Sequence, residues 1–407
     1  MSSKGISRDG HKWTIPVVAL SLWSASLTIG ALKVILPVYF ASAGVSISKI
    51  ALLFFFDTLG QILAPIVVGL AINRLGYRRC LLGGLGIHSL ISFMYIFDPA
   101  FVLIYLERFV RGLTTMPLLS EVYVKHFSPK ESQPHHINIL LGFRDVAKGI
   151  GMFVGGALIA FLPFKYSIAV FGLLTTVAAV IALFYLPDLR EAARAPVLKI
   201  WGIVNAKIKT LGLSRGFLQG AEDAWASAIL PVYLTVVFGL SPTLVGAVMM
   251  AGLIFYGLSV GIMSRLFIAG RDARKALITS GFLLLPVCLV LSLPTSISYL
   301  LLLICLYQLL NSACAIYQNH LKLEFAAEEK ASIDLAAFKS LSNLFKPIAV
   351  FIAGILADTV GFSWVFYFSS VLVFFSALTS LTLPKSAPQL DGVVQSYGGE
   401  FAAVKKP

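Results

Sequence analysis

The chain has 407 residues, of which 58% are hydrophobic and only 13% are charged. Soluble domains usually carry about a quarter charged residues, so this composition excludes an ordinary soluble protein and indicates a protein with lipid as its solvent. A net charge of +13 favours a nucleic-acid partner only if the basic residues gather on one face. They lie instead in alternate polar segments between apolar runs, so we expect no nucleic acid among the partners.

Apolar runs long enough to cross a bilayer recur from one end of the chain to the other. A transmembrane helix needs about 20 predominantly apolar residues, whereas the strands of a membrane barrel are about 10 residues long and alternate in polarity. These runs do not alternate, so the sequence predicts helices. The twelve expected spans are 13–40, 48–72, 80–97, 101–124, 138–161, 167–186, 215–237, 242–269, 276–293, 296–321, 334–358 and 362–383.

Basic residues mark one side of the expected membrane protein. They fill the segment before the first span, the loops after spans two, four, eight and ten, the central stretch and the tail, whereas the other loops offer only Lys49 and Lys165. This positive-inside pattern places both termini in the cytoplasm. The first span is too long for a cleavable signal peptide. We therefore expect an integral protein of a bacterial inner (plasma) membrane.

The two sides of the central stretch repeat each other in sequence. Residues 35–40 read ILPVYF and residues 229–234 read ILPVYL, each followed by a Gly-x-Ser turn, and the pattern Lys148-x7-Gly recurs at Lys346 in the same register. Transporters built from two parallel repeats bind substrate near the midplane between them and alternate access by rocking. The sequence therefore predicts an all-α protein with two pseudo-symmetric six-helix bundles (1–186 and 215–384), a cytoplasmic central loop (187–214) and a cytoplasmic tail (385–407).

Three short motifs lie in the first half of this plan, after span two, in span four and in span five. Residues 69–79 read GLAINRLGYRR and are similar to a G-x-x-x-D-R-x-G-R-R loop, with Asn73 in place of the acid and Tyr77 in place of a basic residue. Residues 108–112 read RFVRG, similar to an R-x-x-x-G element, and residues 151–156 resemble a G-P-x-x-G-G antiporter motif without its proline. With these motifs the chain resembles the major facilitator superfamily over nearly its whole length.

That resemblance implies the family's fold and a transport function. It implies a gating loop that latches the two halves on the cytoplasmic side, and it connects the arginine of the span-four element with proton coupling. It also implies that spans one, four, five, seven, eight, ten and eleven line the central cavity. The residues assigned to the gating loop are Gly69, Asn73, Arg74, Gly76 and Arg78.

Ionisable residues within the apolar spans are functional candidates, because a charge at the bilayer centre costs at least about 2.5–3.5 kcal/mol. Two lysines at equivalent positions of the repeat, Lys148 and Lys346, would approach the cavity from opposite halves and favour an anionic substrate. The candidates for substrate binding are Lys33, Arg108, Arg144, Lys148, Lys346, Gln308, Asn311 and Asn343. The candidates for proton coupling are Asp57, Glu107, Glu222 and Asp223.

Structural roles compete with these assignments. Glu107 and Arg111 have the four-residue spacing of a helical ion pair, and Asp145 and Lys148 have the three-residue spacing. Asp57 has no obvious local partner, so it is either a protonatable group or one half of a salt bridge with Lys33 or a lysine of span eleven. Arg144 and Lys339 are near enough to a helix end to extend to the membrane surface. Gln308 and Asn311 serve equally well in polar packing between helices.

The leading hypothesis is a proton-coupled secondary transporter for a small organic anion or zwitterion, with export favoured over uptake by the span-five motif. Uptake of an anionic nutrient is the alternative, and a non-transporting sensor or scaffold is a second one. An enzyme is not expected, since the sequence offers no nucleophile–base set and no phosphate-binding loop. We expect no cofactor and no metal, with protons, the small molecule and the lipid bilayer as the partners of a functional monomer.

Overall fold

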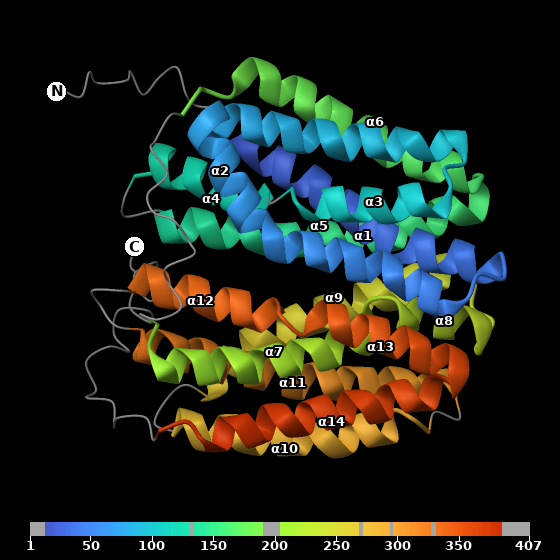
Figure 1. Ribbon diagram of the computed structural model, residues 1–407, viewed down its shortest axis with the longest axis vertical. Helices are drawn as coiled ribbons and strands as arrows, with labels where there is room; N and C mark the ends of the chain where they lie inside the picture. Colours follow the sequence, from blue (N-terminus) through green and yellow to red (C-terminus); the bar gives the residue numbers. More distant parts are fainter. Residues whose placement is uncertain are drawn as a thin grey trace, which may run out of the picture.

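The computed structural model describes residues 13–114, 116–129, 133–189, 204–267, 272–293, 296–326 and 331–384. Within these ranges the chain is helical and has no β-strand, as predicted. Nine of the helical segments in this part of the chain are long and apolar enough to cross a membrane. The helices of residues 13–189 form one group and those of residues 204–384 form the second group beside it (Figure 1). The expected all-α membrane fold with two bundles is confirmed.

The first bundle contains the helices α1 to α6. Their bounds are α1 (Thr14–Ser42), α2 (Ile47–Met94), α3 (Phe101–Gly112), α4 (Met116–Phe127), α5 (Gln133–Phe161) and α6 (Phe164–Tyr185), with the short 3-10 turn η2 (Tyr95–Phe97) before α3. Helix α2 contains the second and third expected spans, which meet at Gly76. The backbone of Gly76 has φ 79° and ψ 166°, a conformation that only glycine adopts without strain.

The second bundle contains the helices α7 to α14. Their bounds are α7 (Ala206–Ala226), α8 (Ile229–Val236), α9 (Pro242–Phe267), α10 (Ala273–Val290), α11 (Ile297–Phe325), α12 (Ala331–Asn343), α13 (Lys346–Thr359) and α14 (Phe362–Leu381). The Asn205 side chain caps α7 by accepting a hydrogen bond from the Lys207 amide at 3.0 Å. The last part of the segment expected as the central loop, up to residue 214, is therefore helical. The expected tail, 385–407, lies outside the described residues.

Three of the expected spans are each divided into two helices. Span four consists of α3 and α4, span seven of α7 and α8 with an interruption at Ser227 and Ala228, and span eleven of α12 and α13 with an interruption at Leu344 and Phe345. Discontinuous helices are common in secondary transporters, where the unwound backbone lies beside the substrate site. We therefore expect functional groups beside these interruptions.

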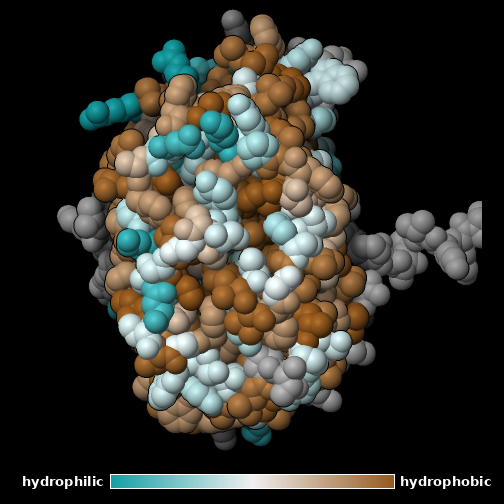
Figure 2. Space-filling model, turned by 90° about the vertical axis from the view of Figure 1, so that its right-hand side faces the viewer, coloured by the Kyte–Doolittle hydropathy of each residue, from teal (hydrophilic) through white to brown (hydrophobic). Residues whose placement is uncertain are grey.

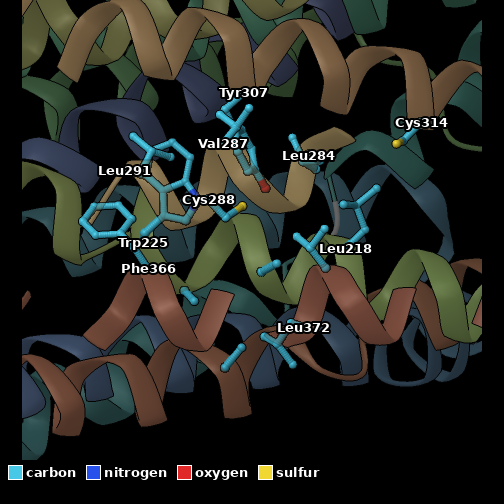
Figure 3. Close-up of a cluster of buried hydrophobic side chains, with 14 of the residues drawn as sticks. Leu218, Trp225, Leu284, Val287, Cys288, Leu291, Tyr307, Cys314, Phe366 and Leu372 are labelled. Carbon is cyan, nitrogen blue, oxygen red and sulfur yellow. The ribbon is translucent and has the colours of Figure 1, made fainter. Parts of the chain in front are cut away.

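The interior of the second bundle is a continuous apolar core. Figure 3 shows the Trp225 and Tyr307 side chains beside Cys288 and Val287, and the Trp225 and Tyr307 rings meet edge to face with centroids 5.0 Å apart. Large apolar side chains also cover the outer surface, and the most exposed include Leu90, Phe97, Val102, Phe161 and Phe184. Soluble proteins seldom expose such a continuous apolar surface, so the outer face fits a lipid environment.

The two bundles touch at the end of the molecule where α2 begins and α13 ends. Helices α5 and α9 approach so closely there that a Cβ atom on Gly156 would meet the Pro242 carbonyl oxygen and one on Gly246 would meet the Met152 carbonyl oxygen. Across the other contact, the Asp358 carboxylate of α13 accepts hydrogen bonds from the first two amides of α2. Figure 2 views this end and shows largely apolar and weakly polar side chains, with strongly hydrophilic ones in a few places.

Candidate functional site

Four charged side chains from four helices converge between the bundles. They are Lys33 of α1, Lys148 of α5, Asp223 of α7 and Lys346 of α13, and we call them the central charge cluster. The Lys346 ammonium lies 3.5 Å from Asp223 Oδ2. Lys33 Nζ donates to Ser227 Oγ at 3.4 Å, and Ser227 Oγ donates to Asp223 Oδ1 at 2.8 Å. One carboxylate of the second bundle is thus linked to a lysine of each bundle.

Lys148 is the unbalanced charge of the cluster. Its charged neighbours are Lys33, Asp145, Asp223 and Arg144, but within the described ranges no carboxylate lies at ion-pair distance from its ammonium group. The cluster therefore holds three lysine side chains and one carboxylate. An excess of basic side chains between two apolar bundles favours an anion, because electrostatic attraction strengthens as the effective dielectric constant falls. Lys148 and Lys346, which were expected to approach the cavity from opposite bundles, both act electrostatically on Asp223.

Close helix packing and two helix interruptions place these groups. A Cβ atom on Gly30 would meet the Lys148 carbonyl oxygen, and one on Gly151 would meet the Leu27 carbonyl oxygen, so α1 and α5 lie in direct backbone contact. The interruption after α7 frees Ser227 to bridge Lys33 and Asp223. The interruption before α13 puts Lys346 at the first position of a helix, where the positive end of the helix dipole adds to its charge.

A second carboxylate, Glu222, faces a different neighbour from Asp223. Its Oε2 accepts a hydrogen bond from Asn311 Nδ2 at 2.9 Å, and its Oε1 accepts one from Gln308 Nε2 at 3.5 Å. Both amides belong to α11 and are buried, whereas Glu222 is half-buried. Among the described residues Glu222 has no cation at ion-pair distance. Adjacent positions on a helix point about 100° apart, which explains why Glu222 and Asp223 face different neighbours.

The remaining acidic candidates belong to a buried network inside the first bundle. Asp57 Oδ2 lies 3.0 Å from Arg108 NH2, and Glu107 Oε1 lies 2.7 Å from Arg111 Nε. The Tyr95 hydroxyl donates to Glu107 Oε2 at 2.8 Å. The pair between Glu107 and Arg111 agrees with their spacing. Asp57, however, pairs with α3, which corrects the expectation of a partner in span one or span eleven.

Arg108 lies enclosed inside the first bundle in this structure. Its side chain is fully buried, and its guanidinium carbon lies 5.7 Å from the centroid of the Phe54 ring. A closed environment of this kind leaves no surface for a substrate. Arg108 serves as the counter-ion of Asp57 in this conformation, and its Nε and NH1 atoms have no hydrogen-bond partner among the described residues.

Two other candidates also have local partners. Asp145 pairs with its neighbour Arg144, with Oδ2 2.9 Å from Arg144 NH2, rather than with Lys148. Asn343 Nδ2 donates to the Lys339 carbonyl oxygen within α12 at 3.1 Å. Both pairs are accessible to solvent in part. They lie at the edge of the site, and neither is joined to the central charge cluster by a hydrogen bond in the described part of the chain.

The gating-loop residues contact their own bundle. After the turn at Gly76, the Tyr77 amide donates to the Leu189 carbonyl oxygen at 3.2 Å, and Arg78 NH2 donates to the Leu183 carbonyl oxygen at 2.5 Å. Arg74 is exposed and Gly69 half-buried. The side chain of Asn73 lies outside the described residues. The described contacts thus fasten the loop to the end of α6.

The second bundle contains the same fastening. Arg274, at the start of α10, donates from NH2 to the Leu381 carbonyl oxygen of α14 at 2.6 Å. Each bundle therefore has an arginine at the start of its third span that caps the last carbonyl groups of its sixth span, a favourable position for a cation at a helix C-terminus. We call the two contacts the arginine clasps.

Two residues that the sequence pattern did not single out make contacts between the bundles. Ser227 joins Lys33 to Asp223, and Asp358 caps α2 across the contact between bundles. A signal for Ser227 was present, because the register that pairs residues 35–40 with 229–234 also pairs Lys33 with Ser227. No such signal existed for Asp358, since a carboxylate near a helix end is most often a solvated surface group.

The geometry contains no cluster suited to metal binding within the described ranges. A metal site needs several His, Cys, Asp or Glu side chains at close range, and no group of three or more of them lies together in this part of the chain. The site is instead a set of ammonium, carboxylate and amide groups at the contact of two helical bundles.

Comparison with known proteins agrees with this architecture. The model of the Major Facilitator Superfamily matches residues 18–206 and 213–402. An inward-facing, occupied structure of a bacterial homologue of the human lysosomal transporter Spinster has a TM-score of 0.76 at 12% identity, covering 90% of this chain and 95% of that one. Its inward-facing, unoccupied form has a TM-score of 0.73 at 13% identity, with coverages of 94% and 98%.

A bacterial metal transporter is also similar, with a TM-score of 0.64 at 17% identity, covering 91% of this chain and 98% of that one. At these identities the likeness to the solved structures concerns the fold alone. No curated protein sequence matches the chain.

Proposed function

Because the chain belongs to the major facilitator superfamily and is a membrane transporter rather than an enzyme, we propose that it moves a small organic anion or zwitterion by alternating access. The central charge cluster is the observation that carries this proposal. It brings together side chains of both bundles, and its three lysine side chains face one carboxylate. An anionic group beside Lys148 would supply the missing counter-charge.

Proton coupling is part of the proposal, and Asp223 and Glu222 are its best-placed carriers. Asp57 and Glu107 are each paired with an arginine inside the first bundle, away from the contact between the bundles. Asp223 contacts Lys346 directly and Lys33 through Ser227. Protonation of Asp223 would release both lysines at once, and would thereby join proton binding to a change at the contact between the bundles.

The contacts of α2 with α13 and of α5 with α9 close the molecule at one end, and this indicates which side of the membrane the site opens to. The basic residues of the sequence lie at the opposite end, so we place the closed end on the non-cytoplasmic side. In that orientation the central charge cluster is reached from the cytoplasm. Export is favoured because residues 151–156 resemble an antiporter motif. A monomer contains the complete cluster.

A thermal-shift screen of the purified protein tests the substrate class. We expect small carboxylates, such as citrate and benzoate, to raise the melting temperature more than choline or a neutral glycoside does. A ligand at 100 times its Kd stabilises the native state by about 2.7 kcal/mol. The variant Lys148→Ala/Lys346→Ala should lose this response, whereas Lys49→Ala, which removes an exposed lysine, should keep it. Equal stabilisation of all these proteins by cations or neutral compounds would contradict the anionic class.

Flux measurements in proteoliposomes distinguish the alternatives. A transporter coupled to protons should move the best ligand of the screen faster when a pH gradient is imposed. A ligand that binds without any flux would indicate the sensor or scaffold. In cells, loss of growth on a nutrient after deletion would indicate uptake, whereas a gain in sensitivity to a toxic compound would indicate export.

A further inference from the structure

Two buried amide oxygens next to Glu222 have no hydrogen-bond donor. Gln308 and Asn311 use their NH2 groups on the Glu222 carboxylate, and their Oε1 and Oδ1 atoms have no partner among the described residues. The side chains are 8% and 1% exposed. Buried polar atoms are normally satisfied, so orphaned acceptors at this position indicate a missing donor.

The carboxylate of Glu222 beside these oxygens indicates that the missing donor is positively charged. Arg215, two helical turns before Glu222 on α7, donates from NH1 to Gln318 Oε1 at 3.1 Å, and in the described part of the chain no cation lies at ion-pair distance from Glu222. The free hydrogen-bonding capacity of Glu222, Gln308 and Asn311 themselves thus consists of carboxylate and amide oxygens. An ammonium group has three donors, no acceptor and a positive charge, so it matches this set in both hydrogen bonding and charge.

The position of the group relates it to the central charge cluster. Glu222 and Asp223 are consecutive residues of α7, with Cα atoms about 3.8 Å apart, and their side chains point to different neighbours. A region of excess positive charge therefore adjoins a region of excess negative charge within the span of one small molecule. A purely anionic compound fills only the first region.

We propose that Glu222, Gln308 and Asn311 form an ammonium subsite, and that the substrate is a zwitterion whose anionic group faces Lys148 while its protonated amine faces Glu222. The inference rests on the proposed transport function and deepens it. It assigns Glu222 a contact with substrate rather than a role in carrying protons alone. In this subsite the NH2 groups of the two amides hold the carboxylate in place, and their oxygens accept hydrogen bonds from the amine of the substrate.

Equilibrium binding to matched compounds tests the subsite without any proton gradient. One set is phenylalanine, 3-phenylpropionate and phenethylamine, and a second set with a longer spacing is 4-aminobutyrate, butyrate and butylamine. We expect one of the two zwitterions to bind at least about tenfold more tightly than its anion and its amine, because charge-assisted hydrogen bonds are made at both ends. In Glu222→Gln, which keeps the shape but removes the charge, this preference over the anion should disappear.

A second variant covers the case in which Glu222→Gln does not fold. Gln308→Met removes one amide oxygen while retaining similar volume, and it should also reduce the preference for the zwitterion. Asn319→Ala removes an exposed amide of the same helix, whose Oδ1 accepts a hydrogen bond from Lys322 Nζ at 3.2 Å; it is the control and should leave the preference unchanged.

The outcomes separate the two proposals. If anions bind as tightly as zwitterions and Glu222→Gln has no effect on the ratio, the ammonium subsite is refuted while the anionic substrate class stands. The same pattern together with lost proton-driven flux in Glu222→Gln would assign Glu222 to proton transfer only. If neither anions nor zwitterions bind, both proposals fail.

Discussion

The charged side chains within the membrane differ in how far their ion pairs are exposed to solvent. The pair of Asp57 with Arg108 is buried on all sides, whereas Asp223 and Lys346 are about one fifth exposed, with side-chain values of 24% and 21%. A buried pair tolerates no change of charge during a transport cycle without a large desolvation cost. A partly exposed pair can exchange its partner for a ligand. This difference separates the framework of the first bundle from the site between the bundles.

Removing Arg108 should destabilise the protein strongly. Arg108→Met leaves Asp57 as an unpaired buried carboxylate, at a cost of about 3–5 kcal/mol. We expect a markedly lower melting temperature in detergent, measured by the loss of the monodisperse peak after heating. Asp57→Asn/Arg108→Met should recover part of the loss, because both charges are absent.

The control for this experiment is Arg74→Met, which removes an exposed arginine of α2 and should leave the melting temperature unchanged. If Arg108→Met melts at the native temperature and impairs only transport, Arg108 has the functional role that the sequence resemblance implied.

Sequence spacing finds partners on one helix and fails for partners on different helices. The pair of Glu107 with Arg111 followed from their separation, but the partner of Asp57 depends on how α2 packs against α3. That packing is set by Gly60 and Gly112, where each added Cβ atom would meet the backbone of the other helix. A single sequence does not reveal which glycines face each other, so this part of the network was not predictable.

At the scale of helices, the apolar runs gave the number and order of the spans, because membrane thickness fixes the length of such a run. The interruption of span seven was not visible, because the residues around Ser227 are as apolar as their neighbours. Span eleven did contain a signal, since Pro347 is a residue typical of a helix start and lies at the beginning of α13. The start of α7 was set too late for a related reason. Its first two turns alternate lysines with the buried Ile208 and Leu211, which is typical of an amphipathic helix at a membrane surface rather than a span.

The cap that Asp358 places on α2 should hold one end of the molecule closed. Asp358→Asn keeps one acceptor and removes the charge, and hydrogen bonds to a charged group contribute about 1.5–3 kcal/mol. We expect the equilibrium to move about tenfold or more toward a form that is open at this end. Spin labels at Lys49→Cys and Thr359→Cys, in a background without the four native cysteines, should report a larger fraction of long distances.

Asp98→Asn provides the comparison, because Asp98 lies at the same end but pairs with Lys165 of its own bundle at 3.8 Å. Its distance distribution should match that of the native protein. An unchanged distribution in Asp358→Asn as well would show that helix packing alone keeps this end closed.

At the scale of the whole molecule, the distribution of basic residues makes a prediction about orientation. The exposed Lys49 lies at the closed end, and the exposed Arg79 lies at the end with the arginine clasps. The positive-inside rule places Lys49 outside the cell and Arg79 in the cytoplasm. A membrane-impermeant maleimide should therefore label Lys49→Cys in intact cells and Arg79→Cys only after permeabilisation. The reverse labelling pattern would place the closed end in the cytoplasm.

The two arginine clasps bear on the history of the molecule. Arg78 and Arg274 make the same contact in the two bundles, whereas the position of Lys33 in the first bundle is occupied by Ser227 in the second. The most economical history is a gene duplication in which the ancestral unit already had the clasp. The charge asymmetry around Asp223 then arose after duplication, when the two copies no longer had to fit an identical partner. On this account the proposed substrate site is younger than the scaffold that holds it.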